Sequence, residues 1–211
     1  MILDKNIALE TATFLLQINA IKLNSKKPFK WASGWRSPIY CDNRLALSFP
    51  KVRTFIVNEI ANQVRSLYGT KISIAGVATG AIGVGALVAN QLNAPFLYVR
   101  PEPKKHGRKN QIEGLSPKDK KIVVIEDLIS TGMSSLNAVK ALKDEGAKVL
   151  GMFAIFNYGF EIAKSNFESI SLTLNSLSDY ENLINAAEIL NHIQFQEIET
   201  LKSWRENPAD W

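Results

Sequence analysis

An acidic pair followed by a hydroxyl-rich turn carries the clearest chemical signal in the sequence. Glu126 and Asp127 directly follow the aliphatic run 122–125, and Ser, Thr and Gly occupy positions 130–132. Carboxylates accept hydrogen bonds and repel anions, so their expected partners are a vicinal diol or a metal ion. The turn leads into a helical pattern, and the N–H groups at a helix N-terminus can hold a phosphate. A diol next to a phosphate indicates a ribose 5-phosphate.

The same stretch also has a purely structural interpretation. A strand that ends in acidic residues and leads into a capped helix is common in α/β proteins. Packing does not require the acidic pair, however, and the pair directly precedes a turn with many hydrogen-bond donors. We therefore favour a ligand-binding role for residues 126–134.

A cationic stretch at 100–119 holds the second group of candidate residues. Its first ten positions contain five Lys and Arg residues, one Glu and His106, which gives a net charge of +4 with histidine neutral. Polar connections of this length are usually lids, binding loops or disordered segments. Lysine and arginine suit a pyrophosphate, and histidine can donate a hydrogen bond or a proton. The alternative is a solvated loop with an ordinary surface histidine.

Length and composition predict one globular domain. The 211 residues are 46% hydrophobic, which is enough to bury a full core. Residues 1–10 lack the apolar segment of a signal peptide, and no run of 18 apolar residues occurs, so we expect a cytoplasmic protein without a membrane partner. Cys41 is the only cysteine, which excludes an intramolecular disulfide and a multi-cysteine zinc site.

The net charge of +5 is concentrated in two segments. Residues 20–36 contain five Lys and Arg residues and no acid, and residues 100–109 carry the net +4. Such segments indicate an anionic small substrate or a nucleic acid, although either segment alone is equally compatible with a solvated loop. We predict the small substrate and no nucleic acid partner.

The remaining sequence alternates between helical and strand patterns. Helices are predicted at 4–23, 50–68, 81–92, 133–145, 180–187 and 192–204, strands at 71–77, 95–99, 121–125 and 147–156, an edge strand at 170–174 and a hairpin at 29–41. This alternation predicts an α/β fold with a mostly parallel, doubly wound sheet flanked by helices, whose ligands bind at the carboxyl ends of the strands. We expect a single domain over 1–211, with a small hood subdomain mainly at 1–45, to which the C-terminal segment can contribute, and a core at about 46–165.

Two common nucleotide motifs are missing. Gly83-Val84-Gly85 resembles the start of a dinucleotide fingerprint, but Val88 stands where the third glycine or alanine belongs, so a dinucleotide site is not expected. No Walker A motif occurs in the sequence either.

The stretch 122–135 resembles the phosphoribosyl pyrophosphate motif of the type I phosphoribosyltransferases. In that family a hydrophobic strand leads into two acidic residues, which hold the ribose hydroxyls, and into a Thr-Gly turn, which cradles the 5-phosphate. The resemblance implies the family's fold, with its small hood. It also assigns a binding role for phosphoribosyl pyrophosphate to Glu126, Asp127, Leu128, Ile129, Ser130, Thr131, Gly132, Met133 and Ser134.

Two further motifs resemble those of the orotate-specific members of the family. The loop from Arg100 reads Arg-x-x-x-Lys-x-His-Gly, and a Ser-Gly-x-x-Ser-Pro motif is followed by Tyr-Cys-Asp at 40–42. By this resemblance Arg100, Lys104 and His106 bind phosphoribosyl pyrophosphate, with Lys104 and His106 as the catalytic pair. The catalytic set also includes Asp127, and the residues expected to touch orotate are Ser130, Tyr40 and Cys41.

The resemblance implies a magnesium-dependent enzyme of pyrimidine biosynthesis. Such an enzyme transfers ribose 5-phosphate from phosphoribosyl pyrophosphate to orotate and yields orotidine 5′-phosphate and pyrophosphate. Mg²⁺ would be held through substrate and water, without a direct protein ligand. The family forms homodimers, which implies that loop 100–117 is shared across subunits. Two alternatives stay open, namely a purine phosphoribosyltransferase and a regulator that binds phosphoribosyl pyrophosphate without catalysis.

Four positions depart from the family pattern. Pro101, Gly80 and Ala32 stand where better-studied members carry lysine, and Tyr158 stands where they carry arginine. The contacts to pyrophosphate must therefore be partly redistributed. We predict that Lys105, Arg108 or a lysine of the hood compensates.

Overall fold

A six-stranded sheet forms the centre of the molecule. The computed structural model of the chain describes residues 1–31, 34–102, 111–209 and 211. The sheet has the order β10-β9-β8-β5-β6-β7, and its strands are parallel except for β7 at one edge. The strands are β5 (Ser73–Val77), β6 (Phe96–Val99), β7 (Ile112–Gly114), β8 (Lys121–Ile129), β9 (Lys148–Asn157) and β10 (Leu174–Asp179). The mostly parallel α/β sheet predicted from the sequence is confirmed.

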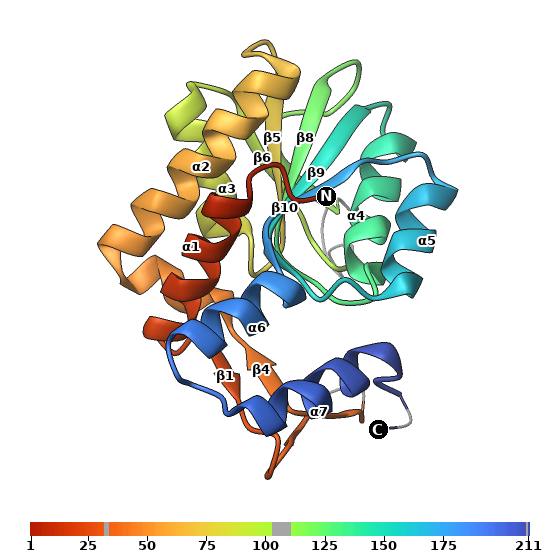
Figure 1. The fold of residues 1–211 in the computed structure, drawn as a ribbon. Coiled ribbons are helices and arrows are strands. Elements are labelled where there is room, and N and C mark those ends of the chain that lie inside the picture. Colours follow the sequence, from red (N-terminus) through yellow and green to blue (C-terminus); the bar gives the residue numbers. More distant parts are fainter. Residues whose placement is uncertain (32–33, 103–110, 210) are drawn as a thin grey trace.

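Helices cover both faces of this sheet (Figure 1). One group consists of α1 (Lys5–Gln17), α2 (Pro50–Tyr68), α3 (Ile82–Leu92) and α6 (Tyr180–Ile189), and the other of α4 (Met133–Asp144) and α5 (Glu161–Ser169). Successive residues of β8 point to opposite faces, so Val123 and Ile125 pack with the first group, and Ile122 and Val124 with the second. This explains why the strand is a continuous aliphatic run.

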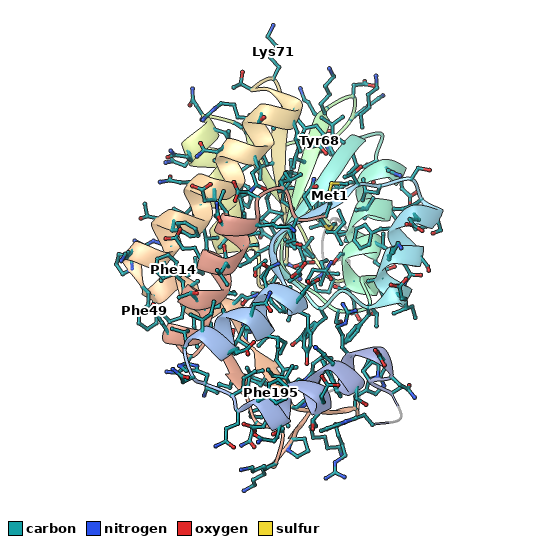
Figure 2. The ribbon with its side chains drawn as sticks, in the orientation of Figure 1. Met1, Phe14, Phe49, Tyr68, Lys71 and Phe195 are labelled. Atoms are coloured by element: carbon teal, nitrogen blue, oxygen red, sulfur yellow. The ribbon has the colours of Figure 1, made fainter. Side chains whose placement is uncertain are left out.

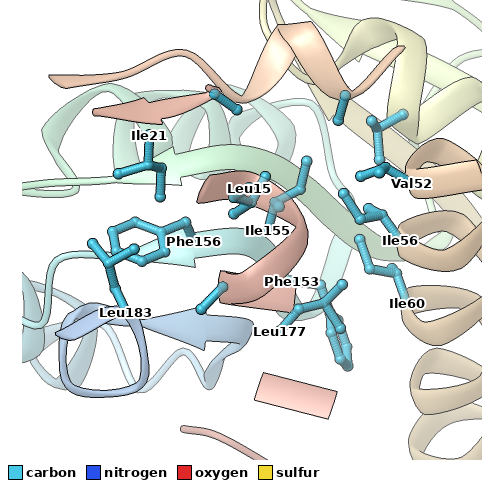
Figure 3. Packing of buried hydrophobic residues seen from close by; sticks show 14 of the residues in the cluster. Leu15, Ile21, Val52, Ile56, Ile60, Phe153, Ile155, Phe156, Leu177 and Leu183 are labelled. Atoms are coloured by element: carbon cyan, nitrogen blue, oxygen red, sulfur yellow. The ribbon is translucent and has the colours of Figure 1, made fainter. Parts of the chain in front are cut away.

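The larger of the two hydrophobic clusters joins segments that are far apart in the sequence. Figure 3 shows Leu15 of α1 and Ile56 of α2 close to Phe153 of β9 and Leu177 of β10. These side chains are fully buried or nearly so. In the part of the chain that the structure describes, no helix is both long and apolar enough to cross a membrane.

Two small sheets and a C-terminal helix lie below the main sheet in Figure 1. β1 (Ile21–Leu23) pairs with β4 (Ile39–Cys41), β2 (Phe29–Lys30) pairs with β3 (Arg36–Ser37), and a 3₁₀ helix, η1 (Asn43–Ser48), follows. α7 (Phe195–Glu206) is tied to these sheets, because the Trp204 Nε1 donates a hydrogen bond to the Arg36 carbonyl oxygen at 3.0 Å. We propose that these elements form the hood and that the sheet with its helices forms the core.

A cluster of aromatic rings joins the small sheets to the main sheet. Trp31 packs on Tyr158, which follows β9, and on Trp204 of α7, with ring centroids 5.1 and 5.6 Å apart. Tyr158 is only 1% exposed. We refer to Trp31, Trp35, Phe156, Tyr158, Phe160, Tyr180 and Trp204 as the aromatic cluster.

Three predicted boundaries were wrong. The helix expected over 4–23 ends at Gln17, because Asn19 adopts the left-handed conformation, with φ 56°, and the chain then enters β1. The edge strand expected at 170–174 lies at Leu174–Asp179, where polar residues hide its pattern. The strand expected to end at 125 continues to Ile129, so the acidic pair lies inside β8.

Candidate active site

A cavity of about 410 Å³ lies at the carboxyl ends of β5 and β8. Three segments line it: the end of β4 with the start of η1, the turn after β5, and the end of β8 with the turn into α4. The lining residues are Cys41, Asp42, Arg44, Val77, Ala78, Thr79, Gly80, Glu126, Asp127, Leu128, Ser130, Thr131, Gly132, Met133, Ser134 and Ser135. The location agrees with the rule that ligands of parallel sheets bind at these strand ends.

The turn between β8 and α4 presents hydrogen-bond donors to the cavity. Gly132 precedes α4 with a φ of 78°, a conformation that residues with a side chain rarely adopt, and its carbonyl oxygen accepts the hydrogen bond from Leu136 N. The first N–H groups of α4 have no partner within the helix. Because Ser130, Thr131 and Ser134 line the same space, hydroxyl and backbone donors converge there.

Glu126 is buried and already hydrogen-bonded. It is 5% exposed, and its carboxylate accepts hydrogen bonds from Ser135 Oγ at 2.8 Å and from Asp127 N at 3.0 Å. Burial, and after it the charge of Asp127, raises the pKa of Glu126 well above the ordinary value of a glutamate. The inner carboxylate of the pair is therefore held by the protein itself.

Asp127 is the outer carboxylate of the pair. Its backbone carbonyl oxygen accepts a hydrogen bond from Asn43 Nδ2 at 2.7 Å, which joins η1 to β8. Its carboxylate lies against Gly80, so that an added Cβ at Gly80 would overlap all three carboxylate atoms. A side chain at residue 80 would therefore displace the carboxylate of Asp127 from its present position.

A comparison with known proteins gives the family. Residues 51–180 match the family model described as the phosphoribosyl transferase domain. The chain belongs to the phosphoribosyltransferase family. It is 52% identical to the curated orotate phosphoribosyltransferase of Cytophaga hutchinsonii, over 98% of this chain and 99% of the relative, and 49% identical to that of Bacteroides fragilis, over 98% of both.

Solved structures of phosphoribosyltransferases have the same fold. The structure of Leishmania donovani UMP synthase matches 98% of this chain and 43% of its own, with a TM-score of 0.79 and 24% identity. Orotate phosphoribosyltransferase from Aeropyrum pernix matches 87% of this chain and 99% of its own, with a TM-score of 0.73 and 28% identity. The type I phosphoribosyltransferase fold expected from the motifs is thus confirmed.

Most of the residues expected at the phosphoribosyltransferase motif line one cavity. They are Glu126, Asp127, Leu128, Ser130, Thr131, Gly132, Met133 and Ser134. Ile129 is fully buried in the core instead. Of the two residues expected to touch orotate from the hood, Cys41 lines the cavity, whereas Tyr40 packs on Phe29 with ring centroids 5.7 Å apart.

Of the predicted loop residues, the structure describes Arg100 alone. Arg100 directly follows β6 and pairs with Glu113 of β7 at 3.7 Å, and it does not line the cavity. Lys104 and His106 lie outside the described residues, as do Lys105 and Arg108. The roles of all these residues stay predictions.

Sequence reasoning missed three residues near the acidic pair. Asn43 and Arg44 belong to a 3₁₀ helix that has no pattern in the sequence, and Ser135 lies one residue beyond the predicted motif. The available signal for Ser135 was its hydroxyl near the start of the helix that follows the acidic pair. A second cavity of about 710 Å³, beside α5 and β10, holds none of these residues.

Proposed function

We propose that the protein is an orotate phosphoribosyltransferase. It transfers ribose 5-phosphate from phosphoribosyl pyrophosphate to N1 of orotate and releases pyrophosphate, a step of de novo pyrimidine biosynthesis. The observation that carries the proposal is that Asp127 and the amino end of α4 face one cavity, in a chain about half identical over nearly its full length to orotate phosphoribosyltransferases.

In this proposal the substrate occupies three parts of the cavity. The 5-phosphate binds the N–H and hydroxyl groups of the turn at 130–134, where the helix dipole adds a partial positive charge. Asp127 accepts hydrogen bonds from the ribose hydroxyls. Orotate then approaches from the hood side, next to Ser130 and Cys41. The bond from the sugar to pyrophosphate breaks as the bond to orotate N1 forms.

Lys104 and His106 complete the catalytic set in this proposal. The reaction builds negative charge on the leaving pyrophosphate and positive charge on the sugar ring, so it needs cations at the leaving group more than covalent chemistry. In a Lys104→Ala variant we expect turnover to fall about 100-fold or more, because one preorganised charge is lost. Unaltered turnover would remove the loop from the mechanism.

Magnesium fits the donors in the cavity. Among the described residues, no group of three His, Cys, Asp or Glu side chains forms a metal site. Mg²⁺ that binds with phosphate substrates keeps several waters and is held largely by substrate oxygens, so this cavity can take up the ion with its substrate without a direct protein ligand, while Asp127 accepts hydrogen bonds from the ribose hydroxyls. When bound, the ion neutralises charge on the pyrophosphate. Its binding remains part of the proposal.

The proposal includes a homodimer in which loop 100–117 reaches the partner's cavity. A mixture of Lys104→Ala and Asp127→Asn subunits tests this arrangement. If the loop acts across the interface, one of the two sites in each mixed dimer is intact, and random mixing restores about a quarter of wild-type activity. If the loop acts within its own subunit, no site is intact and activity stays absent. The cytoplasmic location stays a prediction from the sequence.

One assay decides between this function and its alternatives. Wild-type protein is incubated with magnesium, phosphoribosyl pyrophosphate and either orotate or adenine, and pyrophosphate release is measured. We expect release with orotate only. Release with adenine instead would indicate the purine enzyme, and binding of phosphoribosyl pyrophosphate without release would indicate the regulator.

A further inference from the structure

Arg44 is the one Lys, Arg or His side chain among the described residues that line the cavity. Its guanidinium binds Asp42 through two parallel hydrogen bonds, Nε to Oδ1 at 2.6 Å and Nη2 to Oδ2 at 2.9 Å. No other described residue forms a hydrogen bond or ion pair with it. The edge formed by Nη1 and Nη2 is therefore available to a second anion.

The facing turn of the cavity, at 77–80, supplies no cation. Its residues are Val77, Ala78, Thr79 and Gly80, and a side chain at Gly80 would collide with the carboxylate of Asp127. Yet a pyrophosphate that enters this cavity brings several negative charges, which are costly to desolvate without a positive partner. Among the described lining residues, Arg44 is the available partner.

We propose that Arg44 binds the pyrophosphate group of phosphoribosyl pyrophosphate and that Asp42 positions it. This inference rests on the proposed function and deepens it, because nothing in the family motif places a cation at residue 44. Arg44 and Asp127 line the same cavity, so a sugar held by Asp127 brings its pyrophosphate into the cavity that Arg44 also lines. The fork of arginine suits paired phosphate oxygens.

The charges of Arg44 and Asp127 also interact. The hydrogen bonds that Arg44 donates to Asp42 raise the pKa of Arg44 most, and the charge of Asp127 adds to that rise. Arg44 is thus close enough to the sugar-binding carboxylate for their charges to interact. Its side chain is 59% exposed, which leaves it accessible to a ligand.

The experiment compares two ligands of the proposed active site, of which only inorganic pyrophosphate occupies the position assigned to Arg44. Dissociation constants of inorganic pyrophosphate and of orotidine 5′-phosphate are measured, with magnesium, for the wild type, Arg44→Gln and Arg44→Lys. For Arg44→Gln we expect pyrophosphate binding to weaken about 10- to 100-fold, the range for a lost charge-assisted hydrogen bond. Orotidine 5′-phosphate, which has no pyrophosphate, should bind within about 2-fold of the wild type. Arg44→Lys, which keeps the charge without the fork, should fall between.

Arg65→Gln is the matched control. Arg65 lies in the last turn of α2, near Tyr68, which Figure 2 places at the end of the molecule away from α7. We expect this variant to bind both ligands as the wild type does. If Arg44→Gln does not fold, Arg44→Lys decides by the same comparison.

Three results would overturn the proposal. Weaker orotidine 5′-phosphate binding with unchanged pyrophosphate binding would place Arg44 at the orotate carboxylate. Equal losses for both ligands would show a general disturbance of the cavity, and no loss for either would leave a surface ion pair only. Pyrophosphate binding does not depend on orotate turnover. If the wild-type protein binds pyrophosphate but releases none from phosphoribosyl pyrophosphate with orotate, the proposed acceptor is refuted and the role of Arg44 is not.

Discussion

Two strand-to-helix turns face the same cavity and differ in almost every respect. The turn from β8 to α4, at 130–132, carries two hydroxyls and a glycine in the left-handed conformation. The turn from β5 to α3, at 78–81, has mostly small residues, and Gly80 leaves its side-chain space to Asp127. In the proposed function, the first turn contributes hydrogen-bond donors that bind the phosphate. The second turn contributes space, because Gly80 has no Cβ and the carboxylate of Asp127 lies next to it.

This difference explains why only one turn is visible as a motif. Hydroxyls behind an acidic pair suggest a ligand by their chemistry. A glycine gives no such sign, because the same residue serves turns, close packing and flexible loops. Only the structure shows that the carboxylate of Asp127 occupies the space next to Gly80.

The largest effect is expected from a methyl group in the second turn. A Gly80→Ala variant must displace the carboxylate of Asp127, because the new Cβ overlaps it. Misplacing a positioning group by about 1 Å can cost about 100-fold in rate, so we expect kcat/KM for phosphoribosyl pyrophosphate to fall by about that factor. Steady-state kinetics with orotate as the acceptor measures it.

A nearby glycine provides the control. Gly83 starts α3, and a Cβ there meets the movable end of the Leu47 side chain, which can shift at little cost. Gly83→Ala should therefore keep kcat/KM near the wild-type value. If Gly80→Ala is equally active, the second turn has no steric role and the contrast between the turns fails.

A smaller effect is expected from the first turn, which has several donors. Thr131→Val keeps the shape of the side chain but removes one hydroxyl from the cavity. A hydrogen bond to a charged group is worth about 1.5–3 kcal/mol, so binding of orotidine 5′-phosphate should weaken by about 10- to 100-fold. Isothermal titration calorimetry measures this, with the exposed Thr70→Val as control. Unchanged affinity would show that the Thr131 hydroxyl does not hold the phosphate.

The smallest effect concerns the buried acid beneath the first turn. Burial, with the charge of Asp127 second, raises the pKa of Glu126. Above the ordinary carboxyl pKa the unfolded chain releases a proton that the folded protein still binds, so stability falls as pH rises toward the raised pKa. Glu126→Gln cannot ionise and escapes this loss. Its melting temperature relative to the wild type should therefore increase from about pH 4 to about pH 8. A difference that does not change with pH would contradict the raised pKa.

Features encoded by neighbouring residues could be predicted from the sequence. Features that depend on contacts between distant segments could not. The aliphatic run of β8 and the hydroxyls at 130–134 are contiguous in the chain, so the motif and the parallel sheet could be predicted. Arg44 lines the cavity because η1 folds against the end of β8, where Asn43 Nδ2 donates a hydrogen bond to the Asp127 carbonyl oxygen. β10 was misplaced because polar residues such as Ser178 are buried in it, and the Ser178 Oγ donates its hydrogen bond to the Ala8 carbonyl oxygen, far away in the sequence.

The tie between Trp204 and the Arg36 carbonyl also has a consequence for biosynthesis. The two residues are 168 positions apart, so the hood strands leave the ribosome long before their helical partner exists. Contacts of such long range form late, and exposed aromatic surface is prone to aggregation until they do. We therefore expect the aromatic residues near β2 and β3 to stay exposed in the nascent protein until α7 has been synthesised.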